Sequence, residues 1–251
     1  MYKILANTIF LGKDIISLPE CHSTNDVAMT RIKSKEAAEG TIVITENQTK
    51  GKGQRGNVWK VQPEMNLTFS LVLSPNFLNP RDQFDLNIMV SMAIYEVLSD
   101  YAGGLKVKWP NDIVHENKGK LGGILIENII GQRGIEFSVL GIGLNINQKL
   151  FDFPSATSIA KLSGLDVDKW EIFKLLIRKI ELYYLELKKG DFKEVKKNYL
   201  KNLFRYQEWA TYSDTEEFSG KITGLKEEGR LIIEKKDGSQ NFYAFKEVVF
   251  L

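Results

Sequence analysis

At residues 41–59 the chain reads Thr41-Ile42-Val43-Ile44-Thr45-Glu46-Asn47-Gln48-Thr49-Lys50-Gly51-Lys52-Gly53-Gln54-Arg55-Gly56-Asn57-Val58-Trp59. The β-branched residues at 41–45 follow Gly40 and predict a buried strand. The next residues set glycines between Lys50, Lys52 and Arg55, which exposes backbone N–H groups beside positive charge. The stretch therefore predicts an anion-binding loop that leaves the end of a strand, where ligand sites commonly lie.

Two common glycine fingerprints do not describe this loop. The chain contains no G-x-x-x-x-G-K-[ST], and the loop spacing is not that of a G-x-G-x-x-G that opens a helix after a strand. The loop therefore indicates a nucleotide-handling family of another kind.

Length and composition indicate a globular protein with one sizeable core and room for a small second domain. The chain has 251 residues, of which 43% are hydrophobic and 26% are charged. Its 34 basic and 32 acidic residues leave a net charge of +2, which is too small to argue for nonspecific attraction to nucleic acid or membranes. Any electropositive site must therefore be local.

The cysteine count and the hydropathy pattern favour a cytoplasmic protein. Cys21 is the single cysteine, which excludes an intrachain disulfide, and we expect it to be an inert thiol. No run of about 18 apolar residues is present, and residues 1–7 lack a signal-peptide core. We therefore expect a cytoplasmic protein without a membrane partner.

Hydrophobic periodicity predicts an α+β fold around a mixed or antiparallel central sheet. Besides 41–45, strands are expected at 66–73, 106–114, 120–127 and 137–147, with one or two edge strands within 1–22. Pro110 is expected to mark a bulge or an edge. Helices are expected at 81–101, 168–189 and 191–205, where apolar residues recur at helical spacing. The sheet should therefore have five or more strands, with helices between and after them.

A short polar segment, Ser23-Thr24-Asn25-Asp26, precedes the helical pattern that begins at Val27. Its side chains have the acceptors of a helix N-cap, and on one interpretation they do no more than cap the helix. On the other, the hydroxyl and amide groups at the helix N-terminus grip a polar ligand. The segment alone leaves both interpretations open.

The pattern changes after Tyr206. Short β segments at 219–223, 231–234 and 242–245 are separated by the turn signals Glu228-Gly229 and Asp237-Gly238. Closely spaced strands of this kind predict a small β-barrel. We therefore expect a first domain at residues 1–205 and a small barrel domain at 206–251.

Five motifs in order resemble those of the biotin protein ligases. They are Ser23-Thr24-Asn25, the 51–56 loop ending at Trp59, Lys108-Trp109-Pro110-Asn111-Asp112, Lys120-Leu121-Gly122-Gly123-Ile124-Leu125, and Gly141-Ile142-Gly143-Leu144-Asn145. The resemblance spans about residues 20–147 and implies a catalytic domain of the biotin/lipoate ligase type. That fold is like the class II aminoacyl-tRNA synthetases and carries an SH3-like C-terminal barrel. Since no helix-turn-helix precedes the motifs, the resemblance implies the monofunctional type, without DNA binding.

The resemblance implies a two-step reaction with biotin and Mg-ATP as substrates. Biotin and ATP give biotinyl-5′-adenylate, and a lysine of a biotin carboxyl carrier domain of a biotin-dependent carboxylase then takes the biotinyl group. Biotin's carboxylate must approach a negative α-phosphate, and two unit charges about 4 Å apart repel by roughly 4 kcal/mol at an effective dielectric near 20. Fixed cations have to offset this repulsion, and the expected catalytic residues are Lys120, Lys52 and Arg55.

By the same resemblance, the substrates have expected contacts. Biotin is expected to contact Ser23, Thr24, Asn25, Gln48, Gly51, Lys52, Gly53, Gln54, Lys120 and Gly123. The adenylate is expected to contact Arg55, Trp59, Asn111, Lys120 and Asn145. Asp112 is expected to bind Mg²⁺, because that hard cation takes carboxylate and phosphate oxygens. The alternative for Trp59 is burial in the core, and the alternative for Asp112 is the capping of a turn.

One feature departs from the family pattern, and three rival functions remain open. Gln54 stands at a loop position where many members have arginine, which leaves open how Gln54 and Arg55 share that role. The rivals are a lipoate ligase or octanoyl transferase, a non-catalytic biotin- or nucleotide-binding regulator, and a nucleic-acid patch at Lys50, Lys52 and Arg55. We expect no DNA partner, and a monomer or weak homodimer.

Overall fold

The structure is a computed structural model that describes residues 7–132 and 134–251, and of Arg55 only the backbone. Over these residues a seven-stranded sheet forms the centre of the molecule. Across the sheet the strands are β1 (Ile15–Cys21), β2 (Ile42–Gln48), β3 (Leu67–Leu73), β7 (Gly134–Leu144), β6 (Gly119–Gly131), β5 (Asp112–His115) and β4 (Leu105–Lys108). Only β1 and β2 run parallel, and the other neighbours are antiparallel. The prediction of a mixed sheet of five or more strands is confirmed.

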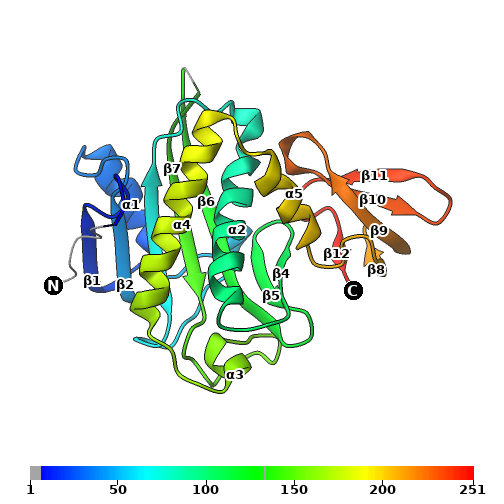
Figure 1. Cartoon of the computed structure of the whole chain (residues 1–251), viewed down its shortest axis with the longest axis horizontal. Helices are drawn as coiled ribbons and strands as arrows, with labels where there is room; N and C mark the ends of the chain where they lie inside the picture. Colours follow the sequence, from blue (N-terminus) through cyan, green and yellow to red (C-terminus); the bar gives the residue numbers. More distant parts are fainter. Residues whose placement is uncertain (1–6, 133) are drawn as a thin grey trace.

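The helices are α1 (Thr24–Lys33), α2 (Phe84–Ser99), α3 (Ile159–Ser163), α4 (Lys169–Lys189) and α5 (Lys193–Lys201), with 3₁₀ turns η1 (Gln54–Gly56), η2 (Pro80–Asp82) and η3 (Glu227–Gly229). The two longest, α2 and α4, run side by side over the strands (Figure 1). α4 begins where Asp168 accepts hydrogen bonds from the N–H groups of Trp170 and Glu171, and it ends at Gly190. The predicted helices at 81–101 and 168–189 are confirmed. The third is shorter than expected, because α5 ends at Lys201.

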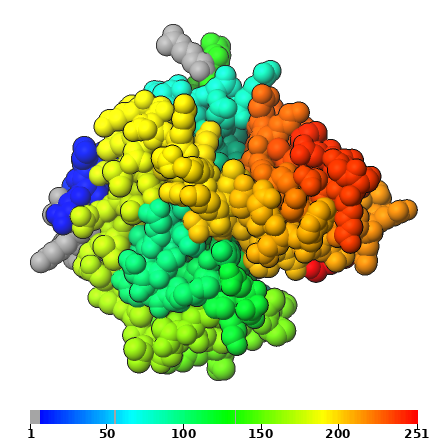
Figure 2. All heavy atoms as spheres, turned by 45° about the vertical axis from the view of Figure 1, so that its right-hand side comes forward, coloured from blue at the N-terminus to red at the C-terminus, as the bar shows by residue number. Residues whose placement is uncertain are grey.

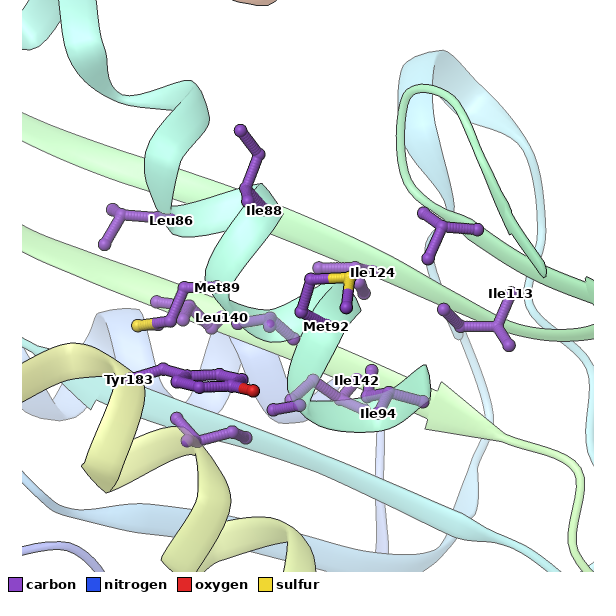
Figure 3. Close-up of a cluster of buried hydrophobic side chains, with 14 of the residues drawn as sticks. Leu86, Ile88, Met89, Met92, Ile94, Ile113, Ile124, Leu140, Ile142 and Tyr183 are labelled. Carbon is purple, nitrogen blue, oxygen red and sulfur yellow. The ribbon is translucent and has the colours of Figure 1, made fainter. Parts of the chain in front are cut away.

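Alternation along the strands divides the sheet into two different faces. Leu67, Phe69 and Leu71 of β3 and Leu140 and Ile142 of β7 point to the side of α2 and α4. Figure 3 shows Met89 and Met92 of α2 over that side of β7, with Tyr183 of α4 beside them. This face carries the main core.

The opposite face is covered only in part, by α1. Ala28 and Ile32 of this helix pack on Val43, Val72 and Val139 in a smaller cluster. Further along the same strands this face carries Thr68, Ser70, Gly141 and Gly143, whose small side chains leave room above the sheet. The sheet is thus built to bury one face and to leave part of the other open.

At the edge of the sheet formed by β5 and β4, the structure differs from the single strand expected at 106–114. Pro110 was expected to interrupt a single strand over 106–114, but it lies in the turn of a hairpin that joins β4 to β5. The Trp109–Pro110 peptide bond is cis. The hairpin brings Trp109 inward, where it is buried, and leaves Asn111 and Asp112 at the start of β5.

A second sheet follows α5. Its antiparallel strands lie in the order β11 (Gln240–Tyr243), β10 (Leu231–Lys235), β9 (Glu217–Leu225), β8 (Trp209–Ser213) and β12 (Val249–Phe250). β9 and β10 confirm two of the predicted strands, whereas β8 and β12 were not predicted. The strand predicted at 242–245 ends at Tyr243, because Phe245 turns away and packs on Phe84 and Trp109. The domain boundary at 205/206 stays a prediction.

The second sheet packs directly on the first part of the chain. The indole of Trp109 donates a hydrogen bond of 2.8 Å to the carbonyl of Gly229, which ties the β4–β5 hairpin to η3. Figure 2 shows the orange and red atoms of this sheet against those of α5. None of the helices in the described residues is long and apolar enough to cross a membrane.

Candidate active site

A cavity of about 240 Å³ lies on the open face of the sheet, between α1, the 51–59 loop and strands β3, β6 and β7. Most of the residues predicted for the site line it: Ser23, Thr24, Asn25, Gln48, Lys52, Gly53, Gln54, Trp59, Asn111, Asp112, Lys120 and Gly123. Gly51 and Asn145 do not, and the side chain of Arg55 lies outside what the structure describes. Motifs separated by up to a hundred residues thus meet in one place.

Ser23 argues against the capping interpretation of the polar segment before α1. The residue occupies the N-cap position with extended backbone, yet its side chain makes no capping hydrogen bond. It is buried and lines the cavity. The interpretation that this serine serves only as a cap is therefore wrong.

The neighbouring polar residues form a connected network. The backbone N–H of Thr24 donates to Oε1 of Gln48 at 2.7 Å. Asn25 Nδ2 donates to Glu127 Oε2 at 2.6 Å, and Ser70 Oγ lies 2.6 Å from Asn25 Oδ1. Ser70 and Glu127 were not found from the sequence, because neither belongs to a motif and only the sheet brings them to α1.

The glycine loop folds back on itself. The N–H of Trp59 donates to the carbonyl of Gly51 at 2.9 Å, and that of Gly53 donates to the carbonyl of Asn57 at 2.7 Å. A Cβ at Gly51 would lie 2.2 Å from the carbonyl oxygen of Trp59, so the close approach requires glycine. Gly51 therefore serves the shape of the loop rather than the lining of the cavity.

Each of the two predicted catalytic lysines that the structure describes is paired with a carboxylate. Lys52 Nζ lies 2.6 Å from Asp26 Oδ1 of α1, and the hydrogen bond to this carboxylate raises the pKa of Lys52. Lys120 Nζ lies 2.7 Å from Asp112 Oδ1. Both pairs are partly exposed, so each holds its ammonium group in place without burying it.

Lys120 lies at the centre of the site. Its side chain crosses Gly123, where a Cβ would come within 3.2 Å of Nζ, and Nζ is 5.7 Å from the ring centroid of Trp59. The glycine after Leu121-Gly122 therefore makes room for the lysine. This is a physical reason for the Lys-Leu-Gly-Gly pattern.

Trp59 is not an ordinary core residue, since it is half-buried and its ring lies on Gly143. A Cβ at Gly143 would lie 2.4 Å from Cε2 of the ring. Among the described residues, Trp59 Nε1 and Thr68 Oγ1 are buried beside the cavity without a hydrogen-bond partner. Buried polar atoms rarely stay unpaired, so the cavity is suited to a polar ligand.

The two asparagines expected near the nucleotide have different positions. Asn111 lines the cavity, while its Nδ2 donates to the carbonyl of Ile124 at 2.6 Å. Asn145 Nδ2 donates to the carbonyl of Thr157 at 3.0 Å, which supports the segment after β7. Asn145 therefore acts as a support behind the cavity in this structure.

The donor set for a metal is small. Within the described residues there is no group of three or more His, Cys, Asp or Glu that could hold a metal ion. Asp112 is one carboxylate at the cavity, and Mg²⁺ commonly binds through one or two carboxylates together with substrate phosphates and water. The site therefore fits Mg²⁺ carried by a nucleotide rather than a protein cage.

Lys246 is a lining residue that the motifs did not indicate. It lies between β11 and β12 of the second sheet, is exposed, and has a φ of 69°. No local pattern marks it, because its place at the cavity depends on how the second sheet packs on the first. The second sheet therefore contributes a cation to the same site.

Comparisons with known proteins show what this chain is similar to. The family model described as "Biotin/lipoate A/B protein ligase family" matches residues 18–147, just over half of the chain. The biotin protein ligase of Aquifex aeolicus, solved in complex with biotin and ATP, shares 27% identity at a TM-score of 0.78, over 95% of this chain and 99% of that one.

Two curated relatives match over most of the chain. The bifunctional ligase/repressor BirA of Bacillus subtilis (strain 168) is 29% identical over 94% of this chain and 74% of its own length. The biotin–[acetyl-CoA-carboxylase] ligase of Paracoccus denitrificans is 29% identical over 79% and 85%. With a family model that matches just over half of its residues, this chain belongs to the biotin/lipoate A/B protein ligase family.

Proposed function

We propose that this protein is a biotin protein ligase, which activates biotin as biotinyl-5′-AMP and transfers the biotinyl group to a lysine of a biotin carboxyl carrier protein. One observation carries the proposal: a single cavity combines uncharged hydrogen-bonding groups from α1 and Gln48 with the ammonium groups of Lys52 and Lys120. A substrate with a polar ring and a carboxylate, next to a nucleotide phosphate, needs both. The similar proteins of Aquifex aeolicus and Paracoccus denitrificans are both described as biotin ligases, which supports this proposal.

The first step joins two anions. A carboxylate oxygen of biotin attacks the α-phosphorus of ATP, and the bond to the β-phosphate breaks so that pyrophosphate leaves with the electron pair. Lys120 and Lys52 offset the repulsion between the two anions and stabilise charge on the phosphate oxygens. Asp112 and Asp26 hold these lysines ready, so little reorganisation is needed when the substrates arrive.

In the second step the carrier lysine, as the neutral amine, attacks the carbonyl carbon of the mixed anhydride. AMP leaves, an amide forms, and the nitrogen loses a proton. The adenylate must not meet water before the carrier arrives, so we assign the 51–59 loop as its cover. Asp112 would hold a Mg²⁺ ion together with the phosphates of ATP, and the ion would supply further charge neutralisation there.

The remaining site residues divide by their chemistry. Ser23, Thr24, Asn25 and Gln48 bind the ureido ring, whose N–H and C=O groups need partners once they leave water. Trp59 stacks on or covers the adenine, and its ring already lies against Lys120 and Gly143. Lys246 adds positive charge at the rim for the nucleotide.

A lipoate ligase is the second candidate, because the family model names both acids. The dithiolane ring of lipoate has no N–H or C=O group. Binding it here would leave the amides of Asn25 and Gln48 facing an apolar ring, and a site built for hydrogen bonds rejects ligands that lack them. The polar end of the cavity therefore favours biotin.

The decisive experiment incubates the purified chain with ATP, Mg²⁺, biotin and a biotin carboxyl carrier domain, and follows the carrier by mass spectrometry. We expect one biotinyl adduct, which disappears when the acceptor lysine is changed to arginine. Parallel reactions with lipoate and octanoate should give no adduct. An unmodified carrier in the biotin reaction would sink the proposal, and an adduct only with lipoate would establish the rival.

A further inference from the structure

Asn25 is held from two sides by three partners, of which Glu127 and Ser70 are not among the described residues that line the cavity. It lies in the first turn of α1 and is buried. Its Nδ2 donates to Glu127 Oε2 at 2.6 Å and to the carbonyl of Leu125 at 3.3 Å, both on β6. Its Oδ1 lies 2.6 Å from the hydroxyl of Ser70 on β3. Strands β6 and β3 therefore fix the side-chain amide of Asn25 from both sides.

The hydrogen-bond partners of Asn25 determine the orientation of its side-chain amide. A carboxylate and a carbonyl only accept hydrogen bonds, so Nδ2 must face Glu127 and Leu125, and both of its protons are used there. Ser70 has one hydroxyl proton, which goes to Asn25 Oδ1 because that oxygen only accepts. Thr24 Oγ1 lies 2.7 Å from Ser70 Oγ and 3.1 Å from Gln48 Oε1, and its single hydroxyl proton is shared between these two contacts. The only bonding capacity that Asn25 has left is a lone pair on Oδ1.

Gln48 presents the opposite polarity. Its Oε1 accepts from the backbone N–H of Thr24, and in the described part of the chain its Nε2 makes no hydrogen bond. Both residues line the cavity. This end of the pocket therefore offers an acceptor from Asn25 and a donor from Gln48, which complement a ligand with an N–H beside a C=O.

We propose that Glu127 and Ser70 are positioning residues that set the polarity of the ring end of the pocket. By binding both N–H groups of Asn25 and one lone pair of its oxygen, they make Oδ1 an obligatory acceptor for a ligand N–H. The inference rests on the proposed function where it names the ureido ring of biotin as that ligand. Specificity for an N–H donor then depends on a carboxylate that the ligand does not touch.

A swap of polarity between positions 25 and 127 tests this role. Asn25→Asp places a carboxylate where Asn25 now lies 2.6 Å from Glu127, and the two like charges should weaken biotin binding at least about a hundredfold. Adding Glu127→Gln restores a donor–acceptor pair and keeps an acceptor toward the ligand. The double variant should bind biotin within about tenfold of the unaltered chain, by titration calorimetry.

The single change Glu127→Gln sharpens the readout. An amide oxygen at this position still accepts from Asn25 but without charge assistance, so the KM for biotin should rise a few-fold while kcat stays the same. Glu136→Gln is the matched control, because Glu136 is an exposed carboxylate on the neighbouring strand β7, and it should change neither value. A double variant that folds normally but binds no better than Asn25→Asp alone would overturn the inference.

A ligand-side measurement keeps the test decisive if Asn25→Asp does not fold. In two biotin analogues, one ureido N–H or the other is replaced by an oxygen atom. The unaltered chain should bind one analogue at least about tenfold more weakly than biotin, whereas Asn25→Ala should bind that analogue and biotin alike. The same ratio in both proteins would contradict an accepting Asn25. If the unaltered chain binds no biotin, the proposed function fails, whereas binding without rescue sinks only the positioning role.

Discussion

The two faces of the central sheet are built from the same strands but are opposite in character. On β7, Leu140 points into the core under α2, while its neighbour Gly141 lies against Asn25 at the cavity. One face is closed by large apolar side chains in contact with two long helices. The other is kept open by glycine, serine and threonine, and it collects polar and charged groups from distant segments. Stability and chemistry are thus assigned to alternate residues of one strand.

The largest expected effect concerns charge on the open face. Lys120→Ala should lower the rate of biotinyl-adenylate formation by about a hundred- to thousandfold, because it removes a cation aimed at the charge that develops on the phosphate. Thermal unfolding should be almost unchanged, since Lys120 is only partly buried. Lys118→Ala, in the exposed turn before β6, is the control. Near-normal adenylate synthesis in Lys120→Ala would refute the catalytic assignment.

The next effect concerns packing on the closed face. Leu140→Ala removes a fully buried side chain and should cost about 2–5 kcal/mol of unfolding free energy, which corresponds to a fall of roughly 5–15 °C in Tm for a chain of this size. The KM for biotin should stay within about twofold at a temperature where the variant is folded. A large rise in KM without loss of stability would contradict the division between the faces.

Gly141→Ala is the partner experiment, one residue along the same strand. A Cβ at this position would lie 2.4 Å from Asn25 Oδ1, so the clamped amide would have to move. We expect the KM for biotin to rise about tenfold or more, while Tm changes by only a few degrees. Calorimetry gives the change in Tm and steady-state kinetics gives the change in KM for Leu140→Ala and Gly141→Ala. The comparison shows whether one face of the sheet governs stability and the other governs biotin binding.

The smallest expected effect comes from the second sheet. Lys246→Ala should raise the KM for ATP about three- to tenfold and leave the KM for biotin unchanged, because an exposed cation at the rim acts through screened charge. The effect should shrink as the salt concentration increases. Equal changes in both KM values would mean that the substitution disturbs the docking of the second sheet instead.

Much of the fold could be predicted because its signals are local. Strand and helix patterns at 41–45, 81–101 and 168–189 follow from the spacing of apolar residues, and the structure confirms them. The predictions were wrong or incomplete where the local sequence signals are weak or conflict. β8 and β12 are short edge elements that the pattern did not separate from loop, and Phe245 left the predicted strand because a tertiary aromatic cluster offers it more burial.

The candidate site shows the same limit. Motif residues such as Lys120 and Gln48 could be named in advance because their neighbours along the chain carry a recognisable pattern. Ser70, Glu127 and Lys246 could not, since nothing beside them in the sequence marks them. Ser23 could be named, but whether its side chain caps α1 or lines the cavity depended on how α1 packs on the sheet.

The sequence by itself determined the family, the alternation that separates a core face from an open face, and the glycines that keep the open face clear. These features depend on residue type and on a period of two along a strand, which are local properties. Only the tertiary structure decided the partners: Asp26 for Lys52, Asp112 for Lys120, and Glu127 with Ser70 for Asn25. Such pairs depend on strand register and on how α1 and the second sheet pack, and a polar side chain has no partner until those long-range contacts form.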